Sequence, residues 1–285
     1  MATVSELRGT LSHPFRYLVP SWLPDHHLDG QTVLPAVEIM LLLASAADEL
    51  VPDFQFSHFA QARFLRLLPI EPKTLELDVQ VELSQEGNDL MAKLSRRVKT
   101  KNITRTLRYA ELVLCASAGK FVPGSSPSLP DCEKKTLTAE KIYKELVPFG
   151  PMFQTLQANL WLTKDMAGGP LRAPERGGEG IFFPLLGSPF PLDGAMHAAC
   201  VHGQHYASFV PFPVSFIKRV VHAPTADGQC YEVVAKLVRQ DVQALFYDIW
   251  VIGENGLIRE EICGLEMRDV TAGNLQSPAW LDRNF

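Results

Sequence analysis

Long hydrophobic runs are missing from this sequence, so we expect no membrane-spanning helix. The longest apolar stretch covers residues 39–47, far short of the roughly 18 residues needed to cross a bilayer. The N-terminus also lacks the basic and then apolar pattern of a secretory signal peptide. The sequence therefore predicts no membrane partner.

Cysteine is scarce, and positive charge is in short supply. The five cysteines are scattered, odd in number and free of any CxxC pair, which excludes a disulfide framework and a zinc ribbon as expectations. A reducing, cytoplasmic location and no metal site are predicted instead. The formal net charge of −5 argues against nucleic acid as a partner.

The chain is long enough for one large domain or for two fused halves. It has 285 residues, of which 46% are hydrophobic, enough to bury a core. Residues 122–135, VPGSSPSLPDCEKK, are dense in proline, serine and glycine, as in a connector, although an ordinary surface loop has the same composition. We predict halves at 1–121 and 138–285, with a linker over 122–137.

The same order of elements is predicted in both halves. Residues 35–50 are predicted as a buried helix, with proline in the first turn. Alternating apolar and polar residues predict antiparallel strands after it, at 75–83, 90–98 and 106–117. The second half gives helices at 139–146 and 192–201, and strands at 153–162, 231–239, 244–252 and 257–268. This order suggests a duplicated unit in which each sheet wraps its own helix.

Two adjacent histidines, His26 and His27, precede the first buried helix. A neutral imidazole is the natural base at physiological pH, and the unpaired N–H groups at the helix start favour developing negative charge. Gly30 lets the backbone approach a ligand or adopt a conformation closed to other residues. A histidine on a loop is, as an alternative, simply structural or solvated.

Asp193 begins the second buried helix, and His197 follows four residues later on the same face. An aspartate in this position is often only an N-terminal cap. The apolar surroundings favour a sharper interpretation, in which burial raises the pKa of the carboxyl so that it holds and donates a proton. His197 would then orient Asp193 by a hydrogen bond.

At these residues the sequence resembles the dehydratase domains of polyketide synthases and fatty-acid synthases. His26, Gly30 and Pro35 match the family motif HxxxGxxxxP, whereas His27 falls out of register. Asp193 and His197 match the second motif, DxxxQ or DxxxH.

Two further segments between and after these motifs extend the resemblance over most of the chain. Residues 150–154, GPMFQ, resemble the YGPxF segment, and residues 210–212, VPF, resemble the LPF segment. The chain departs from the family at Phe149, where a tyrosine is usual, and at Val214, where an aromatic residue is common. Both departures concern the substrate pocket more than the reaction.

The resemblance implies an α+β double hotdog, two tandem curved antiparallel sheets that each wrap a long helix. It implies that His26 and Asp193 meet between the halves and, with His197, catalyse dehydration of a 3-hydroxyacyl thioester carried on acyl carrier protein. Gly30 and the helix opening near Pro35 would polarise the thioester carbonyl. Metals and redox cofactors are not required, and a homodimer is expected. The substrate-binding residues implied in this way are Gly30, Pro35, Gly150, Pro151, Phe153 and Phe212.

Several alternatives stay open at this point. Related double hotdogs cyclise chains or shift double bonds with the same acid–base pair, and a silent structural module or a hotdog thioesterase is also conceivable. Because carrier proteins are generally acidic, docking requires a local basic patch. Arg63 with Arg66, or Lys218 with Arg219, are candidates for this patch, or else ordinary solvated surface.

Overall fold

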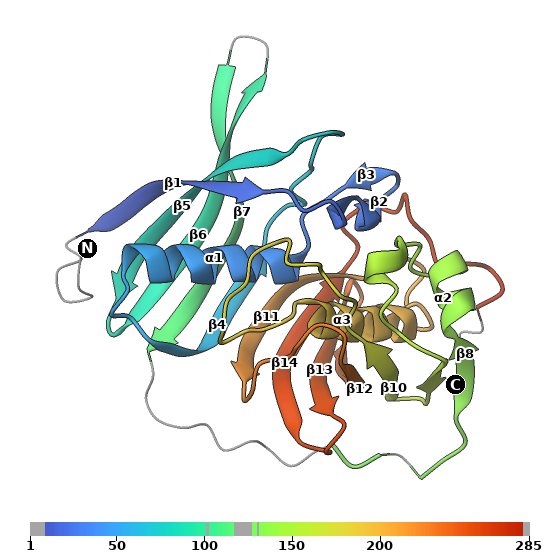
Figure 1. The fold of residues 1–285 in the computed structure, drawn as a ribbon. Helices are drawn as coiled ribbons and strands as arrows, with labels where there is room; N and C mark the ends of the chain where they lie inside the picture. The colour runs from blue at the N-terminus through green and yellow to red at the C-terminus, as the bar shows by residue number, and fades with distance from the viewer. Residues whose placement is uncertain (1–8, 101–102, 117–126, 130, 282–285) are drawn as a thin grey trace.

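Twelve strands form one continuous antiparallel sheet in the computed structural model, which describes residues 9–100, 103–116, 127–129 and 131–281 (Figure 1). The strand order is β1-β5-β6-β7-β4-β11-β14-β13-β12-β10-β9-β8. Strands from the first part of the chain therefore lie together at one end, strands from the second part lie at the other, and β4 pairs with β11 between them.

The strands of the first group are β1 (Thr10–Leu18), β4 (Phe56–Phe64), β5 (Glu76–Glu86), β6 (Asp89–Thr100) and β7 (Ile103–Ala116). The second group contains β8 (Lys135–Thr138), β9 (Asn159–Leu162), β10 (Met166–Arg172), β11 (Phe212–Val221), β12 (Cys230–Gln240), β13 (Ala244–Gly253) and β14 (Ile258–Arg268). A separate hairpin pairs β2 (His27–Leu28) with β3 (Gln31–Thr32).

Each group of strands carries one long helix (Figure 1). Helix α1 (Ala36–Leu50) packs on β5 and β6, helix α3 (Phe190–Gly203) packs on β10, β12 and β13, and the two helices touch each other. All fourteen residues of α3 are buried, as expected for a helix without a wide polar face. The shorter α2 (Ala139–Glu145) precedes the 3-10 turn η3 (Pro151–Phe153), and η2 (Leu23–Asp25) precedes β2. This arrangement is the α+β double hotdog that the resemblance implied.

The predicted strand at 153–162 is wrong over most of its length. Residues 151–153 form η3, and only Asn159–Leu162 form a strand. The first residues of this segment do not join the sheet because their backbone donors are used elsewhere: the N–H groups of Phe153 and Gln154 donate within the η3 turn, and the N–H of Leu156 donates to the hydroxyl of Tyr143. Residues 122–126 and 130 of the predicted linker lie outside the described part, and residues 135–137 of it belong to β8.

Arg219 does not belong to a docking surface, because its side chain is buried at the junction of the two strand groups. It donates from Nε and Nη2 to Oε2 of Glu260 at 3.0 and 2.7 Å, and Nη1 lies 3.5 Å from Sδ of Met40 in α1. A buried arginine in this setting needs its carboxylate partner. The sequence prediction for Arg219 is therefore wrong, and Lys218 beside it is half-buried.

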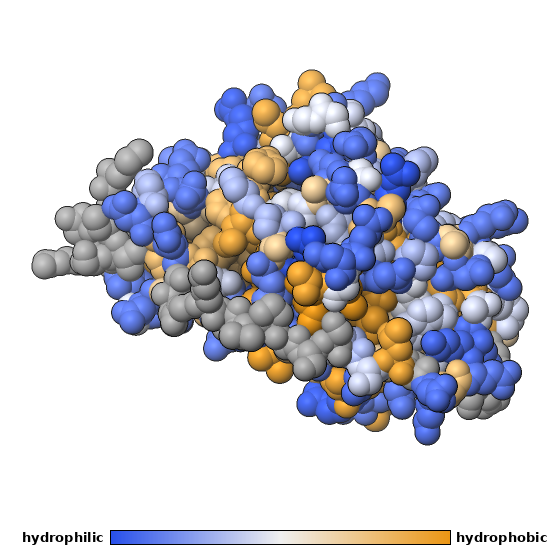
Figure 2. Space-filling view, turned by 60° about the horizontal axis from the view of Figure 1, so that its bottom comes forward, coloured by the Kyte–Doolittle hydropathy of each residue, from blue (hydrophilic) through white to orange (hydrophobic). Residues whose placement is uncertain are grey.

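Large apolar side chains reach the surface singly, from several different elements. Figure 2 shows one face on which hydrophilic side chains are interrupted in several places by hydrophobic ones. The most exposed large apolar side chains in the described part are Val242, Leu75, Phe182 and Ile217, a scatter normal for protein surfaces. None of the helices in the described part is both long and apolar enough to cross a membrane.

Candidate active site

A cavity of about 930 Å³ contains side chains from both parts of the chain. His26 and Pro35 line it from the first part, and Asp193, His197 and Phe212 line it from the second. These five sequence-predicted residues are thus brought together. A mostly apolar cavity with a few convergent titratable groups is the usual form of a small-molecule site.

The chain around His26 leaves one imidazole nitrogen for chemistry. Nδ1 of His26 lies 2.8 Å from the carbonyl oxygen of Val33, and the N–H of Val33 donates in turn to the carbonyl oxygen of His26 at 3.1 Å. Because a carbonyl only accepts, Nδ1 must carry the proton. Nε2 therefore bears the lone pair. The side-chain and backbone hydrogen bonds with Val33 together fix the position of the ring.

Gly30 makes the contacts between His26 and Val33 possible, although it does not line the cavity. Asp29 and Gly30 form the two-residue turn between β2 and β3, with φ of 50° and 76°, the conformation that such hairpins require and glycine adopts at no cost. The turn returns the chain to Val33. Gly30 itself is exposed and does not line the cavity, so its predicted contact with substrate is not supported.

Burial lowers the pKa of His26, because it penalises the imidazolium, although the nearby Asp193 carboxylate opposes that effect. The ring packs in tilted geometry against Phe149 and Phe153, with centroid distances of 4.5 and 4.9 Å. His26 is therefore neutral at physiological pH, the state that a general base requires.

Asp25 fastens the loop of His26 to the second part of the chain. Its backbone carbonyl accepts the N–H of Gly150, and its Oδ2 accepts the N–H of Met152, both at 2.8 Å. A Cβ on Gly150 would lie 2.4 Å from Cγ of Asp25, so only glycine permits this approach. Asp25 thus places Phe149 and Phe153 against His26.

Gly150, Pro151 and Phe153 were predicted to bind substrate, but none of the three lines the cavity. Gly150 is held against Asp25, Pro151 is exposed at the start of η3, and Phe153 is buried between Trp22, Phe190 and His26. Gly150 and Phe153 lie behind the cavity wall, where they support the position of His26.

Phe149 separates the two histidines of the cavity. Its ring centroid lies 4.5 Å from that of His26 and 5.1 Å from that of His197. The residue at the family's tyrosine position is therefore in the cavity wall itself. No phenolic hydroxyl stands between the two imidazoles at this point.

Asp193 and His197 lie in contact on successive turns of α3. Nε2 of His197 is 2.9 Å from Oδ2 of Asp193, at an angle that makes the contact electrostatic rather than an aligned hydrogen bond. Burial by itself raises the pKa of Asp193, but the imidazoles of His197 and His26 outweigh burial and bring the pKa below its ordinary value. The predicted raised pKa is therefore wrong, because that prediction treated the pocket as purely apolar.

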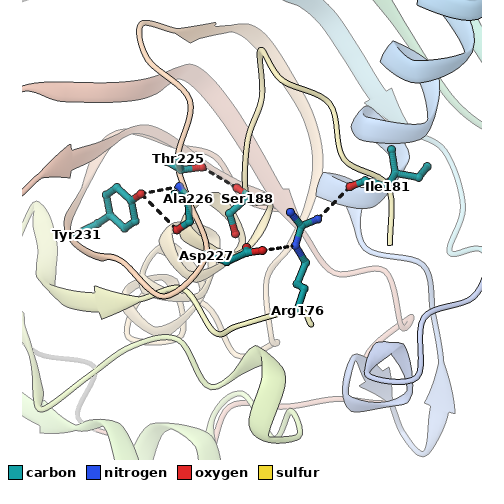
Figure 3. A network of polar contacts seen from close by, with 7 residues as sticks. All are labelled: Arg176, Ile181, Ser188, Thr225, Ala226, Asp227 and Tyr231. Atoms are coloured by element: carbon teal, nitrogen blue, oxygen red, sulfur yellow. Dashed lines mark hydrogen bonds and ion pairs between the residues drawn. The ribbon is translucent and has the colours of Figure 1, made fainter. Parts of the chain in front are cut away.

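The chain entering α3 is clamped by a network of polar contacts, drawn in Figure 3. Oγ1 of Thr225 donates to the carbonyl oxygen of Ser188 at 2.7 Å, and the N–H of Ser188 donates back at 3.0 Å. Nε of Arg176 donates to Asp227 at 2.8 Å, and Nη1 donates to the carbonyl oxygen of Ile181. This clamp fixes the first turn of α3, and with it Asp193.

Glu38 is a fully buried carboxyl in the first turn of α1, close enough to Asp193 to feel its charge. Its Oε2 accepts a hydrogen bond from Tyr17 of β1 at 3.0 Å. Burial raises the pKa of Glu38 from its ordinary value of 4.5 to about 7, against the lowering effects of Tyr17 and Arg176. The folded protein therefore holds a proton that the unfolded chain releases between these values.

Stability is expected to fall as pH rises through this window, because the raised folded pKa makes Glu38 a stabilising proton acceptor only at low pH. The difference between a pKa of 4.5 and a pKa of about 7 corresponds to about 3 kcal/mol. Glu38→Gln keeps an acceptor for Tyr17 and cannot ionise. Urea unfolding is expected to show the variant more stable than wild type at pH 8 and nearly equal at pH 4.5. An equal difference at both pH values would contradict this.

Tyr143 of α2 was not predicted from the sequence. Its hydroxyl oxygen lies 3.3 Å from Nδ1 of His197 and accepts the N–H of Leu156 at 2.8 Å. A tyrosine in a short amphipathic helix gives no signal of this role, and only the fold brings α2 against α3.

Two arginines lie where the cavity reaches the surface. Arg63 and Arg66 are exposed and line the cavity, together with Arg268. Arg63 is paired with Glu111 at 3.2 Å, a surface contact of small energetic value. Among the described residues, no cluster of three potential metal-ligating side chains is found.

Comparisons with known proteins agree with this architecture. Three solved structures share the fold: a trans-AT polyketide synthase dehydratase domain from Brevibacillus brevis, the dehydratase domain of RzxB from Pseudomonas fluorescens, and a bifunctional dehydratase-cyclase domain in ambruticin biosynthesis. In the same order, the TM-scores are 0.72, 0.71 and 0.67, and the sequence identities are 14%, 14% and 16%. The matches cover 92%, 89% and 91% of this chain, and 94%, 94% and 91% of the matched chains.

Models of sequence families assign the chain to a family, which structural matches at such low sequence identity cannot do. No curated protein matches the chain. A family model described as the polyketide synthase dehydratase domain matches residues 6–98. Another, described as the polyketide synthase dehydratase N-terminal domain, matches residues 123–277, more than half of the chain. The chain therefore belongs to the polyketide synthase dehydratase family.

Proposed function

We propose that the chain dehydrates a 3-hydroxyacyl thioester, delivered on acyl carrier protein, to the 2-enoyl thioester. The observation that carries the proposal is the cavity in which a neutral imidazole, His26, faces the same space as the Asp193–His197 pair. The thioester acidifies the α-carbon, so a base on one side and a proton donor on the other supply what the elimination needs.

His26 is the base in this proposal. Its Nδ1 is committed to Val33, so Nε2 takes the α-proton and the ring becomes imidazolium. The carboxylate of Asp193, whose charge acts on His26, stabilises that cation. The rigid attachment of the ring keeps the lone pair aimed at the cavity, and such positioning is itself a large part of catalysis.

The Asp193–His197 pair is the acid. Because the two imidazoles lower the pKa of Asp193, the carboxylic acid that delivers the proton is the minor form of the free site, and the Nε2–H of neutral His197 stabilises the carboxylate that remains. Asp193 passes this proton to the β-oxygen as the C–O bond breaks, and water leaves. Proton transfer from the His26 imidazolium back to the pair resets the site.

The start of α1 is the polarising element. Pro35 and Ala36 line the cavity, and the first N–H groups of a helix have no partner within it. These groups and the helix dipole favour the negative charge that develops on the thioester oxygen. The Gly30 N–H, exposed at the hairpin tip, takes no part.

The carrier arm enters where Arg63 and Arg66 meet the cavity. Their positive charge suits an acidic carrier protein, and the about 930 Å³ of the cavity accommodates an acyl chain and part of the arm. Lys218 and Arg219 are not used, since Arg219 is buried.

Mass spectrometry tests the reaction directly. The protein is incubated with 3-hydroxyacyl pantetheine thioesters of several chain lengths and both configurations at C3. We expect loss of one water from at least one of them, with the 2-enoyl product confirmed by thiol addition. No loss of water from any substrate on carrier protein or on pantetheine, with folded protein, would reject the proposal.

A second outcome of the same assay is ring closure. The structural similarity to a bifunctional dehydratase-cyclase domain makes a dehydration followed by cyclisation the alternative function. Substrates with a further hydroxyl along the chain separate the two, because a cyclised product has the same mass as the enoyl thioester but resists thiol addition.

A further inference from the structure

His197 presents its two ring nitrogens to two different partners. Nε2 lies 2.9 Å from Oδ2 of Asp193, and Nδ1 lies 3.3 Å from the hydroxyl oxygen of Tyr143. In a neutral imidazole one nitrogen donates and the other accepts. An ionised carboxylate can only accept, so the proton of His197 belongs on Nε2, and the partner at Nδ1 has to donate.

Tyr143 is that partner. Its side chain is buried, and its oxygen already accepts the N–H of Leu156 at 2.8 Å. Burial raises the pKa of Tyr143, so the hydroxyl keeps its proton and has that proton to donate. Thr155 also lies against this hydroxyl, and Nδ1 of His197 is the imidazole acceptor within its reach. A hydroxyl that donates to Nδ1 leaves the imidazole proton on Nε2, opposite Asp193.

We propose that Tyr143 is a positioning residue that holds His197 as the Nε2–H tautomer, the opposite of the Nδ1–H tautomer that Val33 imposes on His26. The proposal rests on the proposed dehydration. Of the two imidazoles that flank Phe149, only His26 then offers a lone pair on Nε2, and His197 serves as a donor to Asp193. The different roles of the two histidines are set by the carbonyl of Val33 and the hydroxyl of Tyr143.

The family motif is consistent with a donor at this position. Glutamine, the other residue that the motif admits, offers an amide NH₂ to the same carboxylate and has no tautomer to be fixed. The Asp193–His197 contact is close but poorly aligned, and catalytic hydrogen bonds often tighten in the complex with substrate. With its proton held on Nε2, His197 can move closer to Asp193 without first transferring that proton from the other ring nitrogen.

Nitrogen-15 NMR of the imidazole rings reads the tautomers in the wild-type protein. We expect His197 to show an unprotonated Nδ1 and a protonated Nε2, and His26 to show the reverse. The signals are assigned by their loss in His197→Gln and His26→Asn. A proton on Nδ1 of His197 in the wild type would overturn the proposal, whatever the enzyme assays show.

A double-mutant cycle, measured by enzyme kinetics, tests whether Tyr143 acts through His197. Tyr143→Phe is expected to lower kcat about tenfold, the effect of one lost hydrogen bond, with KM unchanged. In the His197→Gln background the same change is expected to have little effect on kcat. An equal loss in both backgrounds would mean that Tyr143 only supports the fold, and would overturn the proposal.

Tyr247→Phe is the matched control. The hydroxyl of Tyr247 lies 2.9 Å from Nδ1 of His202, a second buried tyrosine–histidine contact on α3 that does not line the cavity. Its loss is expected to lower stability as Tyr143→Phe does, and to leave kcat unchanged. If the wild type fails to dehydrate any substrate, the proposed function fails alone, because the NMR result still decides the tautomer.

Discussion

Replacing His26 by alanine is expected to lower the rate of dehydration by about 10²–10⁴-fold, the contribution of a positioned general base. His26→Asn is the sharper variant, because its side-chain amide can still donate to the carbonyl oxygen of Val33 while offering no lone pair for proton transfer. Both variants are expected to stay folded, since His26 supports one hydrogen bond at the cavity wall. Single-turnover kinetics on a 3-hydroxyacyl pantetheine thioester measures the loss.

The adjacent His27→Ala is the control for this prediction. His27 also lines the cavity but packs only edge-on against Phe149, with centroids 6.4 Å apart, and it should lose far less activity. Because burial lowers the pKa of His26, kcat/KM of the wild type should rise with pH through a midpoint below 6.5. Full activity in His26→Asn, or a midpoint above 6.5, would contradict the assignment of the base.

The buried helices and the long strands could be predicted because their patterns are local. Helix α1 was expected at 35–50 and lies at Ala36–Leu50, and β12, β13 and β14 each lie within one or two residues of the predicted bounds. Alternation along a half-buried strand is visible in the sequence alone. The order of these elements was enough to suggest two sheets, each around its own helix.

Strand β10 shows why other elements could not be predicted. Its sequence, MAGGPLR, contains two glycines and a proline, which argue against a strand. The fold needs them, because a Cβ on Gly168 would lie 2.3 Å from the Trp161 ring and one on Gly169 would lie 2.8 Å from the carbonyl oxygen of Asn159. Close approach between neighbouring strands is a tertiary property without a sequence period.

The residues of the candidate site, too, could be predicted only in part. The family resemblance implied that His26, Asp193 and His197 lie together, and all three line the same cavity. It could not separate residues that touch the cavity from residues that hold its wall, so Gly30, Gly150, Pro151 and Phe153 were expected to meet substrate. Nor could it give the sign of the pKa shift at Asp193, since that depends on two imidazoles brought close only by folding.

Asp193→Asn is expected to cause a loss of similar size to that of the His26 variants, about 10²–10⁴-fold, but at a different step. Asparagine fills the same space and removes the group that hands a proton to the departing oxygen. His26 remains beside the substrate with its Nε2 lone pair, so the α-proton can still be taken and returned. In heavy water the variant should therefore incorporate deuterium at the α-carbon of unreacted substrate.

The same exchange should be absent in His26→Ala, which separates the two roles within one experiment. We expect exchange without dehydration in Asp193→Asn, and neither exchange nor dehydration in His26→Ala. This difference follows from the separate roles of the two side chains. Nδ1 of His26 is fixed on Val33, whereas Asp193 is held against His197 on α3. Exchange that survived in His26→Ala and vanished in Asp193→Asn would make the carboxylate the base, and the low pKa of Asp193 would then describe a proton acceptor.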